Sequence, residues 1–285
     1  MPSVSEPATL EEASAVLASG PSVSIARAGG EIELSTAGLT RVLEHEPGDL
    51  TAIVEAGIKL SDLQAYLGEH GQMLALDPPG DPTVGACLAA DLSGPRRHRY
   101  GAMRDLVIGV TIVLPGGMVA SSGGKVVKNV AGYDLGKLFS GSRGRLGLIA
   151  RVALRLHPRP AAQMTVVAET DAPRALWAEI HRSQLEPSAV DFLPAGRIAC
   201  LFEGPKEAVA AQAAACPGNT ADDAVWAESA AAQLAAGSRA PFDWQECRLA
   251  RPGPRIAYVD GPSEHVWSPL AERVRASFDP EGMLI

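Results

Sequence analysis

The chain lacks the cysteine patterns that point directly to a metal site or a disulfide framework. It has four cysteines, Cys87, Cys200, Cys216 and Cys247, which lie far apart, with no CxxC pair and no nearby histidine at metal-ligand spacing. Four free thiols in a reducing compartment are therefore expected. If the protein works with an iron–sulfur centre, that centre must lie on another chain.

Long apolar runs and an excess of basic residues are also missing. No apolar run approaches the roughly 20 residues of a membrane helix, and the N-terminal sequence lacks the basic and apolar regions of a secretory leader. We therefore expect no transmembrane segment and a cytoplasmic location. The formal net charge of −8 argues against a general nucleic-acid binder. With 285 residues, 46% of them hydrophobic, the chain has room for two globular domains.

Two common glycine-rich nucleotide motifs are absent. A Walker loop needs GxxxxGK followed by Ser or Thr, but the string from Gly132 to Leu138 is one residue short and carries Leu138 where the hydroxyl should be. A Rossmann fingerprint needs GxGxxG, whereas Gly141, Gly144 and Gly147 are spaced GxxGxxG. The sequence therefore predicts neither a P-loop ATP site nor a Rossmann NAD site.

Glycine is instead concentrated in the stretch from Gly123 to Ile149, which holds seven of them. Glycines this close together indicate backbone that takes positive φ or approaches another group closely. Within the stretch, Asp134 can cap a short amphipathic helix and Gly141 can end it. We predict a loop, a short helix and a second loop.

The second loop, GSRGRLG, leads into residues 148–157, whose alternating pattern predicts a strand with one polar face. A glycine loop before a strand can cradle a phosphate or a flat ring, since bare backbone amides can point at an anion. The glycines can equally serve only to make turns. Spacing alone does not decide between the two.

The first part of the chain predicts an ordinary α+β layout. Capping boxes at residues 9–12 and 61–64 predict two helices. Residues 22–30 and 31–38 predict two short strands joined by a tight turn at Gly29-Gly30. Two further strands are predicted, over residues 50–57 and over 105–114.

The segment from Asp77 to Gly101 differs from its surroundings. Its prolines argue against regular structure, and the following TVGACLAADLSG is small and nearly uncharged. Small residues allow a backbone to approach a planar ligand closely. The basic cluster Arg96 to Arg99 then has three open interpretations: a solvated face, an anion site or a docking patch.

A second domain is expected to begin after HPRPAA, which starts at His157. Beyond it, residues 164–170 and 196–204 predict strands, while residues 172–185 and the Ala-rich stretch 207–236 predict helices. No catalytic constellation stands out there. We expect this part to be a small α+β cap.

These segments carry a resemblance to a known family. The strings DPPGDPTVGACLAADLSGPRRHRYGAMRDLVIGV and GGKVVKNVAGYDLGKLFSGSRGRLGLIARVALRLHPRP cover most of Asp77 to Pro160, and FDPEGMLI follows near the C-terminus. The chain resembles the PCMH-type FAD-binding oxidoreductases of the vanillyl-alcohol oxidase family, and within them the FAD-binding subunits of bacterial glycolate oxidases.

The resemblance implies an α+β fold, with a PCMH-type FAD-binding domain of two α+β subdomains over residues 1–160 and a small α+β cap domain over 161–285. It implies FAD as cofactor, lined by backbone and small side chains. The implicated positions near the pyrophosphate and the ring are Pro79, Thr83, Val84, Gly85, Ala86, Ser93 and Gly94, followed by Gly101 and Asp105. Those nearer the adenine are Gly144, Leu146, Gly147 and Ile149.

The function implied by the resemblance is that of a subunit of a glycolate (2-hydroxy acid) oxidase or dehydrogenase, passing electrons from the hydroxy acid through flavin. The implied partners are a second flavin subunit and an iron–sulfur subunit, which could hold the chain at the inner face of the membrane. No catalytic residue is assigned. Tyr133, His98 and Lys128 are candidates by residue type only.

A second hypothesis rests on departures from the family pattern. The early glycine loop is short, since Arg27-Ala28-Gly29-Gly30 is followed at once by Glu31, and Ala86, Asp91 and Arg145 replace the usual residues. Fewer backbone amides and a nearby carboxylate disfavour a bound diphosphate. The alternative is therefore a non-catalytic structural subunit with weak or lost FAD binding, whose partner surface would include the cap and the Arg96 to Arg99 cluster.

Overall fold

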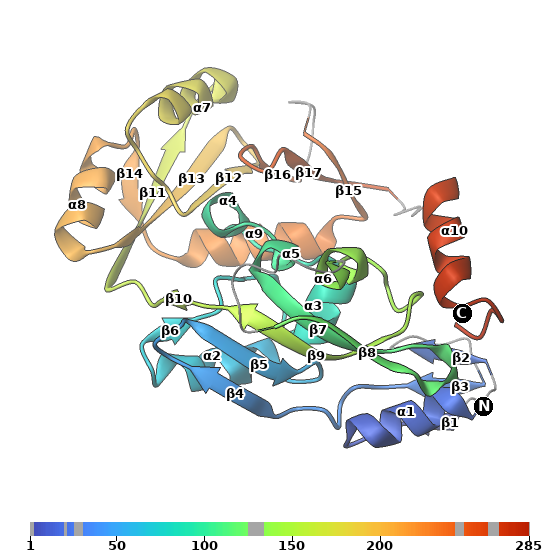
Figure 1. The fold of residues 1–285 in the computed structure, drawn as a ribbon. Coiled ribbons are helices and arrows are strands. Elements are labelled where there is room, and N and C mark those ends of the chain that lie inside the picture. The colour runs from blue at the N-terminus through green and yellow to red at the C-terminus, as the bar shows by residue number, and fades with distance from the viewer. Residues whose placement is uncertain are drawn as a thin grey trace.

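Two large β-sheets organise the chain, one formed by its first half and one by its second (Figure 1). The computed structural model describes residues 3–19, 22–25, 31–124, 134–242, 248–261 and 268–284. Strands and helices are mixed throughout, as expected for an α+β protein. Among the described residues, no helix has both the length and the apolar character needed to cross a membrane.

A small three-stranded sheet begins the chain. It consists of β1 (Ser3–Ser5), β3 (Ile32–Leu34) and β2 (Val23–Ile25), all parallel, with helix α1 (Leu10–Ala18) beside them. The predicted cap of α1 is confirmed, since the Glu12 N–H donates to the Thr9 Oγ1 at 3.1 Å. The predicted tight turn between the next two strands is wrong, because parallel strands cannot be joined by one. Gly29 and Gly30 lie outside the described residues.

The main sheet of the first half has five antiparallel strands. In spatial order they are β4 (Val42–Glu46), β5 (Thr51–Glu55), β9 (Leu148–Arg155), β7 (Val107–Val113) and β8 (Val119–Gly123). The strand predicted after the glycine loop is therefore its central strand, β9. Both faces of β9 are largely buried, so the predicted polar face is reduced to the half-buried Arg151 and Arg155.

Helix α2 (Leu60–Gly68) packs against this part of the core through Leu60, Leu63 and Leu67, as predicted. The predicted capping box is wrong, because the helix begins at Leu60. The Ser61 hydroxyl instead donates to Asp81 at 2.9 Å, and the Gln64 amide donates to the Leu74 carbonyl at 2.6 Å. Two short strands, β6 (Gln72–Met73) and β10 (His157–Pro158), pair beside it.

The segment from Asp77 to Gly101, expected to be irregular, forms two short helices, and a third follows it. They are α3 (Val84–Ala89), α4 (Arg97–Tyr100) and α5 (Met103–Leu106). Strand β7 therefore begins at Val107 rather than at the predicted Asp105. The short helix predicted in the glycine-rich stretch is confirmed as α6 (Leu135–Phe139), where the Asp134 side chain accepts the Lys137 N–H at 3.1 Å.

The second half forms a seven-stranded sheet flanked by helices (Figure 1). In spatial order its strands are β14 (Asn219–Ala221), β11 (Ala162–Glu169), β13 (Arg197–Gly204), β12 (Ala189–Leu193), β16 (Leu249–Arg251), β17 (Ile256–Val259) and β15 (Ser238–Pro241). Its helices are α7 (Pro173–Arg182), α8 (Lys206–Ala215) and α9 (Ala224–Ala235). The strands and helices predicted for this part are confirmed.

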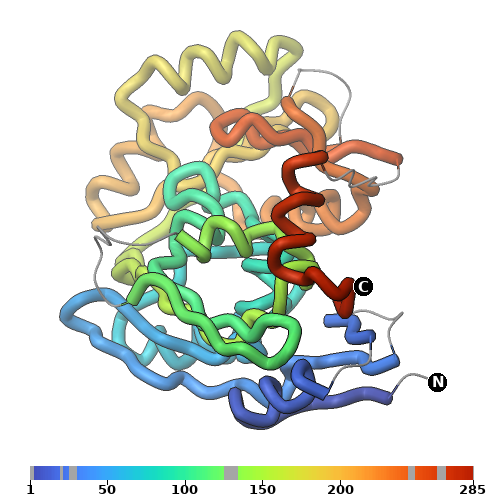
Figure 2. The backbone as a smooth tube through the Cα atoms, turned by 45° about the vertical axis from the view of Figure 1, so that its right-hand side comes forward, coloured from blue at the N-terminus to red at the C-terminus, as the bar shows by residue number. Residues whose placement is uncertain are grey.

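The C-terminal segment returns to the first half. Helix α10 (Pro269–Phe278) packs Val274 and Phe278 onto the first-half core, and Leu284 pairs with Val23 of β2. Both views place the C-terminal end beside the N-terminal sheet (Figure 1, Figure 2). The boundary expected at residue 160 stays a prediction, and the contacts of residues 269–284 lie mainly on its N-terminal side.

Candidate functional site

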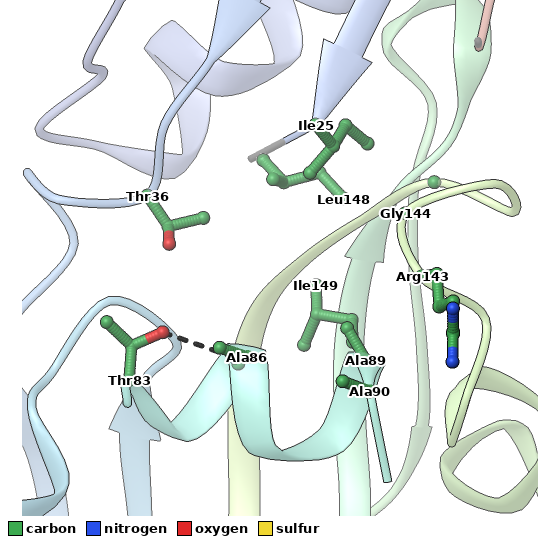
Figure 3. A pocket seen from close by; sticks show the side chains of 12 residues that line it. Ile25, Thr36, Thr83, Ala86, Ala89, Ala90, Arg143, Gly144, Leu148 and Ile149 are labelled. Carbon is green, nitrogen blue, oxygen red and sulfur yellow. Dashed lines mark hydrogen bonds between the residues drawn. The ribbon is translucent and has the colours of Figure 1, made fainter. Parts of the chain in front are cut away.

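A cavity of about 380 Å³ lies where the N-terminal sheet, α3, the second glycine loop and β9 meet (Figure 3). We call it the small-residue cavity. Its lining residues are Ile25, Thr36, Thr83, Gly85, Ala86, Ala89, Ala90, Arg143, Gly144, Gly147, Leu148 and Ile149. Most of this lining is backbone or short apolar side chain, so the wall is close to main chain on several sides.

Helix α3 is held in the wall by its first residues. The Ala86 N–H donates to the Thr83 Oγ1 at 3.2 Å, which caps the helix. The Gly85 N–H donates to the Ala56 carbonyl at 2.7 Å. A Cβ at Gly85 would lie 2.9 Å from that carbonyl oxygen, so glycine is needed for this close approach.

The second glycine loop forms the opposite wall. Gly144 has φ of 78° and Gly147 has φ of 142°, conformations that favour glycine. A Cβ at Gly144 would lie 3.0 Å from the Ile25 Cβ, and one at Gly147 would lie 2.7 Å from the Val113 carbonyl oxygen. The glycines therefore make turns and also bring main chain to the cavity. That the loop cradles a phosphate or a flat ring stays a prediction.

The cavity brings together six of the residues implicated by the resemblance. They are Thr83, Gly85, Ala86, Gly144, Gly147 and Ile149. Sequence reasoning missed Ile25, Thr36, Ala89, Ala90, Arg143 and Leu148. Ala89 and Ala90 could have been predicted because they belong to the small-residue string TVGACLAADLSG. Arg143 could have been predicted because it lies between Gly141 and Gly144. No local signal marked Thr36.

The other implicated residues lie outside this lining, with clear packing roles. Val84 and Leu146 are buried in the first-half core. The Ser93 hydroxyl accepts from Arg97 at 3.1 Å. Gly94 packs directly on the Asp77 main chain, Asp105 accepts the Ala102 N–H at 2.9 Å, and Gly101 turns beside it with φ of 85°. Their assignment to cofactor binding stays a prediction.

A second cavity, of about 240 Å³, lies between the two halves. We call it the seam cavity. Its lining residues are Asp77, Pro79, Pro95 and Arg96 from the first half, and Gln163, Leu201, Asp223, Trp226, Ala230 and Gln233 from the second. Pro79 is the one implicated residue found here. Unlike the small-residue cavity, this one is lined by several charged and amide side chains.

The basic cluster Arg96 to Arg99 forms part of the contact between the halves. The Arg96 guanidinium donates to the Glu203 carboxylate at 2.6 Å and lies 3.6 Å from the Asp77 carboxylate. Arg99 Nη1 donates to the Ser188 hydroxyl at 3.4 Å. None of the three interpretations drawn from the sequence describes these contacts, because partners more than 80 residues away in the chain occupy the cluster.

Two side chains in this region, Asp77 and His98, have shifted pKa values. Burial raises the pKa of Asp77 to about 7, although the Arg96 charge opposes the shift. Burial lowers the pKa of His98, whose Nδ1 has no hydrogen-bond partner among the described residues. The His98 ring packs against Trp177, 6.0 Å between centroids, and lines neither cavity. The other catalytic candidates, Tyr133 and Lys128, lie outside the described residues.

Metal ligands are not assembled anywhere in the described part of the chain, where no group of three His, Cys, Asp or Glu side chains could hold an ion. Cys87, Cys200 and Cys216 are free and buried, as expected for thiols without disulfide partners. All three pack within the hydrophobic cores of the two halves. Cys247 lies outside the described residues.

Comparison with known proteins identifies relatives of the first half. Residues 9–123 match the family model described as "FAD binding domain". The chain is 36% identical over 155 residues to glycolate oxidase subunit GlcE of Escherichia coli, covering 53% of this chain and 44% of that protein. It is 41% identical over 135 residues to the mitochondrial D-lactate dehydrogenase [cytochrome] of Arabidopsis thaliana, covering 47% of this chain and 24% of that protein. The chain thus spans less than half the length of these relatives.

The fold has solved counterparts. An alkyldihydroxyacetonephosphate synthase structure superposes with a TM-score of 0.64 at 19% identity, covering 79% of this chain and 54% of the other. A second structure of that enzyme gives a TM-score of 0.63 over 73% of this chain. The fold class expected from the sequence is confirmed.

Proposed function

We propose that this chain is the flavin-binding subunit of a glycolate (2-hydroxy acid) oxidase or dehydrogenase with FAD as its cofactor, since residues 9–123 match the family model described as "FAD binding domain". The relatives named for glycolate and D-lactate support the choice of a 2-hydroxy acid. The relative named as a glycolate oxidase subunit supports a multi-subunit complex. We propose a second flavin subunit and an iron–sulfur subunit, which could hold it at the membrane surface.

The observation that carries this proposal is the small-residue cavity. Its volume of about 380 Å³ falls within the range of small-molecule sites. The residues that would hold FAD are the six implicated ones in its lining. Gly85 lets α3 pack closely against Ala56 and Gly144 lets the glycine loop pack closely against Ile25, which brings main chain to the cavity wall. Bound FAD supplies a two-electron acceptor for oxidation of a hydroxyl-bearing carbon.

The domain division follows from the two sheets. We propose that residues 1–160 form the flavin-binding domain and residues 161–285 the cap, with α10 and its following residues attached to the flavin-binding domain. The first-half core contacts of Val274 and Phe278 support that attachment. The Arg96–Glu203 contact would hold the cap in place over the first half.

A second candidate function is a structural or electron-relay subunit that does not oxidise the substrate itself. One observation favours it: among the described residues that line the small-residue cavity, none is a carboxylate, histidine, lysine or tyrosine that could remove a substrate proton. In this version, the hydroxy acid would react on a sister subunit.

The test is a visible absorbance spectrum of the purified chain, with flavin released by denaturation and quantified per protein before and after incubation with FAD. Near-stoichiometric flavin that is bleached anaerobically by glycolate or D-lactate is expected for the first candidate. Bound flavin that no hydroxy acid bleaches would favour the second. A folded chain that takes up no flavin would contradict the flavin-subunit proposal.

A further inference from the structure

Arg143 is the one charged side chain among the described residues that line the small-residue cavity. The other lining residues are apolar or glycine, apart from the hydroxyls of Thr36 and Thr83. Arg143 is exposed, and its guanidinium has no hydrogen-bond or ion-pair partner within the described part of the chain. It is therefore a cation at the cavity that the fold itself does not use.

The main chain holds Arg143 at this place. Its N–H donates to the Ala89 carbonyl at 2.8 Å, which ties the loop to the end of α3. Its φ of 52° is left-handed, an uncommon conformation for a residue with a side chain. The next residue, Gly144, has no room for a Cβ against Ile25. The position of the Arg143 Cα is thus fixed, while its side chain is free to move.

The polar groups of the cavity are divided between its ends. Thr36 and Thr83 lie at one end, and Arg143 and Gly144 lie at the other (Figure 3). The Thr83 Oγ1 already accepts the Ala86 N–H. An anionic ligand in the small-residue cavity could therefore pair with one full positive charge among the described lining residues. This charge is that of Arg143, at the end formed by the second glycine loop.

We propose that Arg143 binds the diphosphate of FAD from the end of the cavity that the resemblance implies to be nearer the adenine, and thereby sets the preference of the cavity for a dinucleotide over the bare flavin. This inference rests on the proposal that FAD occupies the small-residue cavity. A guanidinium can donate two parallel hydrogen bonds to phosphate oxygens, and such charge-assisted bonds are stronger than neutral ones. The charge on Arg143 would offset the amides that the shortened loop at Gly29-Gly30 does not provide.

The test is a binding titration of the full chain with three probes: FAD, ADP and riboflavin. Riboflavin lacks phosphate, and ADP carries the diphosphate without the flavin ring. For Arg143→Gln, we expect FAD and ADP to bind about tenfold more weakly, as for the loss of one charge-assisted bond, with riboflavin unchanged. Arg143→Lys keeps the charge without the fork and should fall between. Rising salt should weaken ADP binding to the unsubstituted chain more than to Arg143→Gln.

The matched control is Arg182→Gln, which removes an exposed arginine from α7, away from both cavities. It should leave all three affinities unchanged. Equal ADP affinity in the unsubstituted chain and Arg143→Gln would overturn the inference and leave the flavin proposal intact, as would an equal loss of riboflavin affinity. Failure of the unsubstituted chain to bind FAD would overturn both. Because Arg143 makes no side-chain contact in the described structure, Arg143→Gln is expected to fold normally.

Discussion

The two cavities of this protein differ in the kinds of side chain that line them. The small-residue cavity is lined by main chain and short apolar side chains, with Arg143 as its one charge among the described residues. The seam cavity is lined by charged and amide side chains, most of them paired, as Arg96 is with Glu203 and Asp77. Gln233 Oε1 has no hydrogen-bond partner among the described residues. We propose that the first cavity holds a ligand, whereas the lining of the second joins two parts of the chain.

Because the two cavities differ in this way, we expect substitutions in them to change different properties of the protein. Changes at the seam should act mainly on the free energy of unfolding, because buried charges would lose their partners. Changes in the small-residue cavity should act mainly on flavin affinity. A protein in which both kinds of change altered both properties equally would not fit this comparison.

The largest effect is expected from Glu203→Gln. The Glu203 side chain is fully buried and accepts three hydrogen bonds from Arg96, at 2.6, 3.1 and 3.4 Å. Removing its charge leaves a largely buried guanidinium short of a partner and should lower the free energy of unfolding by about 3 kcal/mol. Denaturant unfolding measures this loss, and flavin affinity at low denaturant should stay unchanged. A loss below about 1 kcal/mol would mean that the Arg96–Glu203 pair stabilises the fold no more than an ordinary surface ion pair does.

The next effect is a pH dependence from Asp77. Its pKa is raised from 3.8 to about 7 in the folded protein, so the folded state binds the proton more tightly than the unfolded state. Its stabilising contribution is therefore complete below about pH 4 and is lost as the pH rises through about 7. The change should be on the order of 2 kcal/mol.

Thermal or denaturant unfolding between pH 4 and 8 measures this dependence. Asp77→Asn cannot ionise and should flatten the fall in stability across that range. The groups that face Asp77 are Arg96 and Arg251, which lower its pKa, and Asp191, which raises it. An unchanged slope in Asp77→Asn would mean that another group causes the pH dependence.

We expect Gly144→Val to lower stability less than the changes above and to weaken flavin binding clearly. The new Cβ would lie 3.0 Å from the Ile25 Cβ at a φ of 78°. We expect FAD affinity to fall about tenfold, or about 1.4 kcal/mol, because the valine occupies the cavity wall. Gly116→Val is the matched control, since Gly116 has φ of 80° but a Cβ added there would meet nothing within 4 Å. Equal flavin affinity in the two variants would count against FAD in this cavity.

The smallest effect is expected at an exposed ion pair that, like Arg96–Glu203, joins an arginine to a glutamate. Arg197 and Glu228 pair on the surface of the second half, where the Glu228 side chain is 43% exposed. Glu228→Gln should cost only about 0.5 kcal/mol, since water solvates both groups. The contrast with Glu203→Gln isolates burial as the cause of the difference. A cost as large as that of Glu203→Gln would contradict this explanation.

The sequence predicted those features whose causes are local. The Asp134 cap of α6, the Thr9 cap of α1 and the buried strand β9 depend on residues a few positions apart. The positive φ of Gly144 and Gly147 could also be anticipated, because dense glycines usually mark such backbone. Six lining residues of the small-residue cavity followed from these segments and from the resemblance.

The features that the sequence missed depend on distant partners. Ser61 has a capping pattern, but Asp81 competes for its hydroxyl and the helix begins one residue earlier. The sequence left the role of the basic cluster open, because Glu203, the buried partner of Arg96, lies more than 100 residues away. Thr36 reaches the cavity only because β3 pairs in parallel with β2, which no local pattern indicated.

The pairing of Leu284 with Val23 has a consequence for biosynthesis. Strand β2 leads directly to Ile25 in the small-residue cavity, and the Val23 N–H donates to the Met283 carbonyl at 2.9 Å. On the ribosome, this edge of the N-terminal sheet stays open until residues 283 and 284 have emerged from the exit tunnel. A nascent chain that still lacks them would expose the same apolar edge to aggregation.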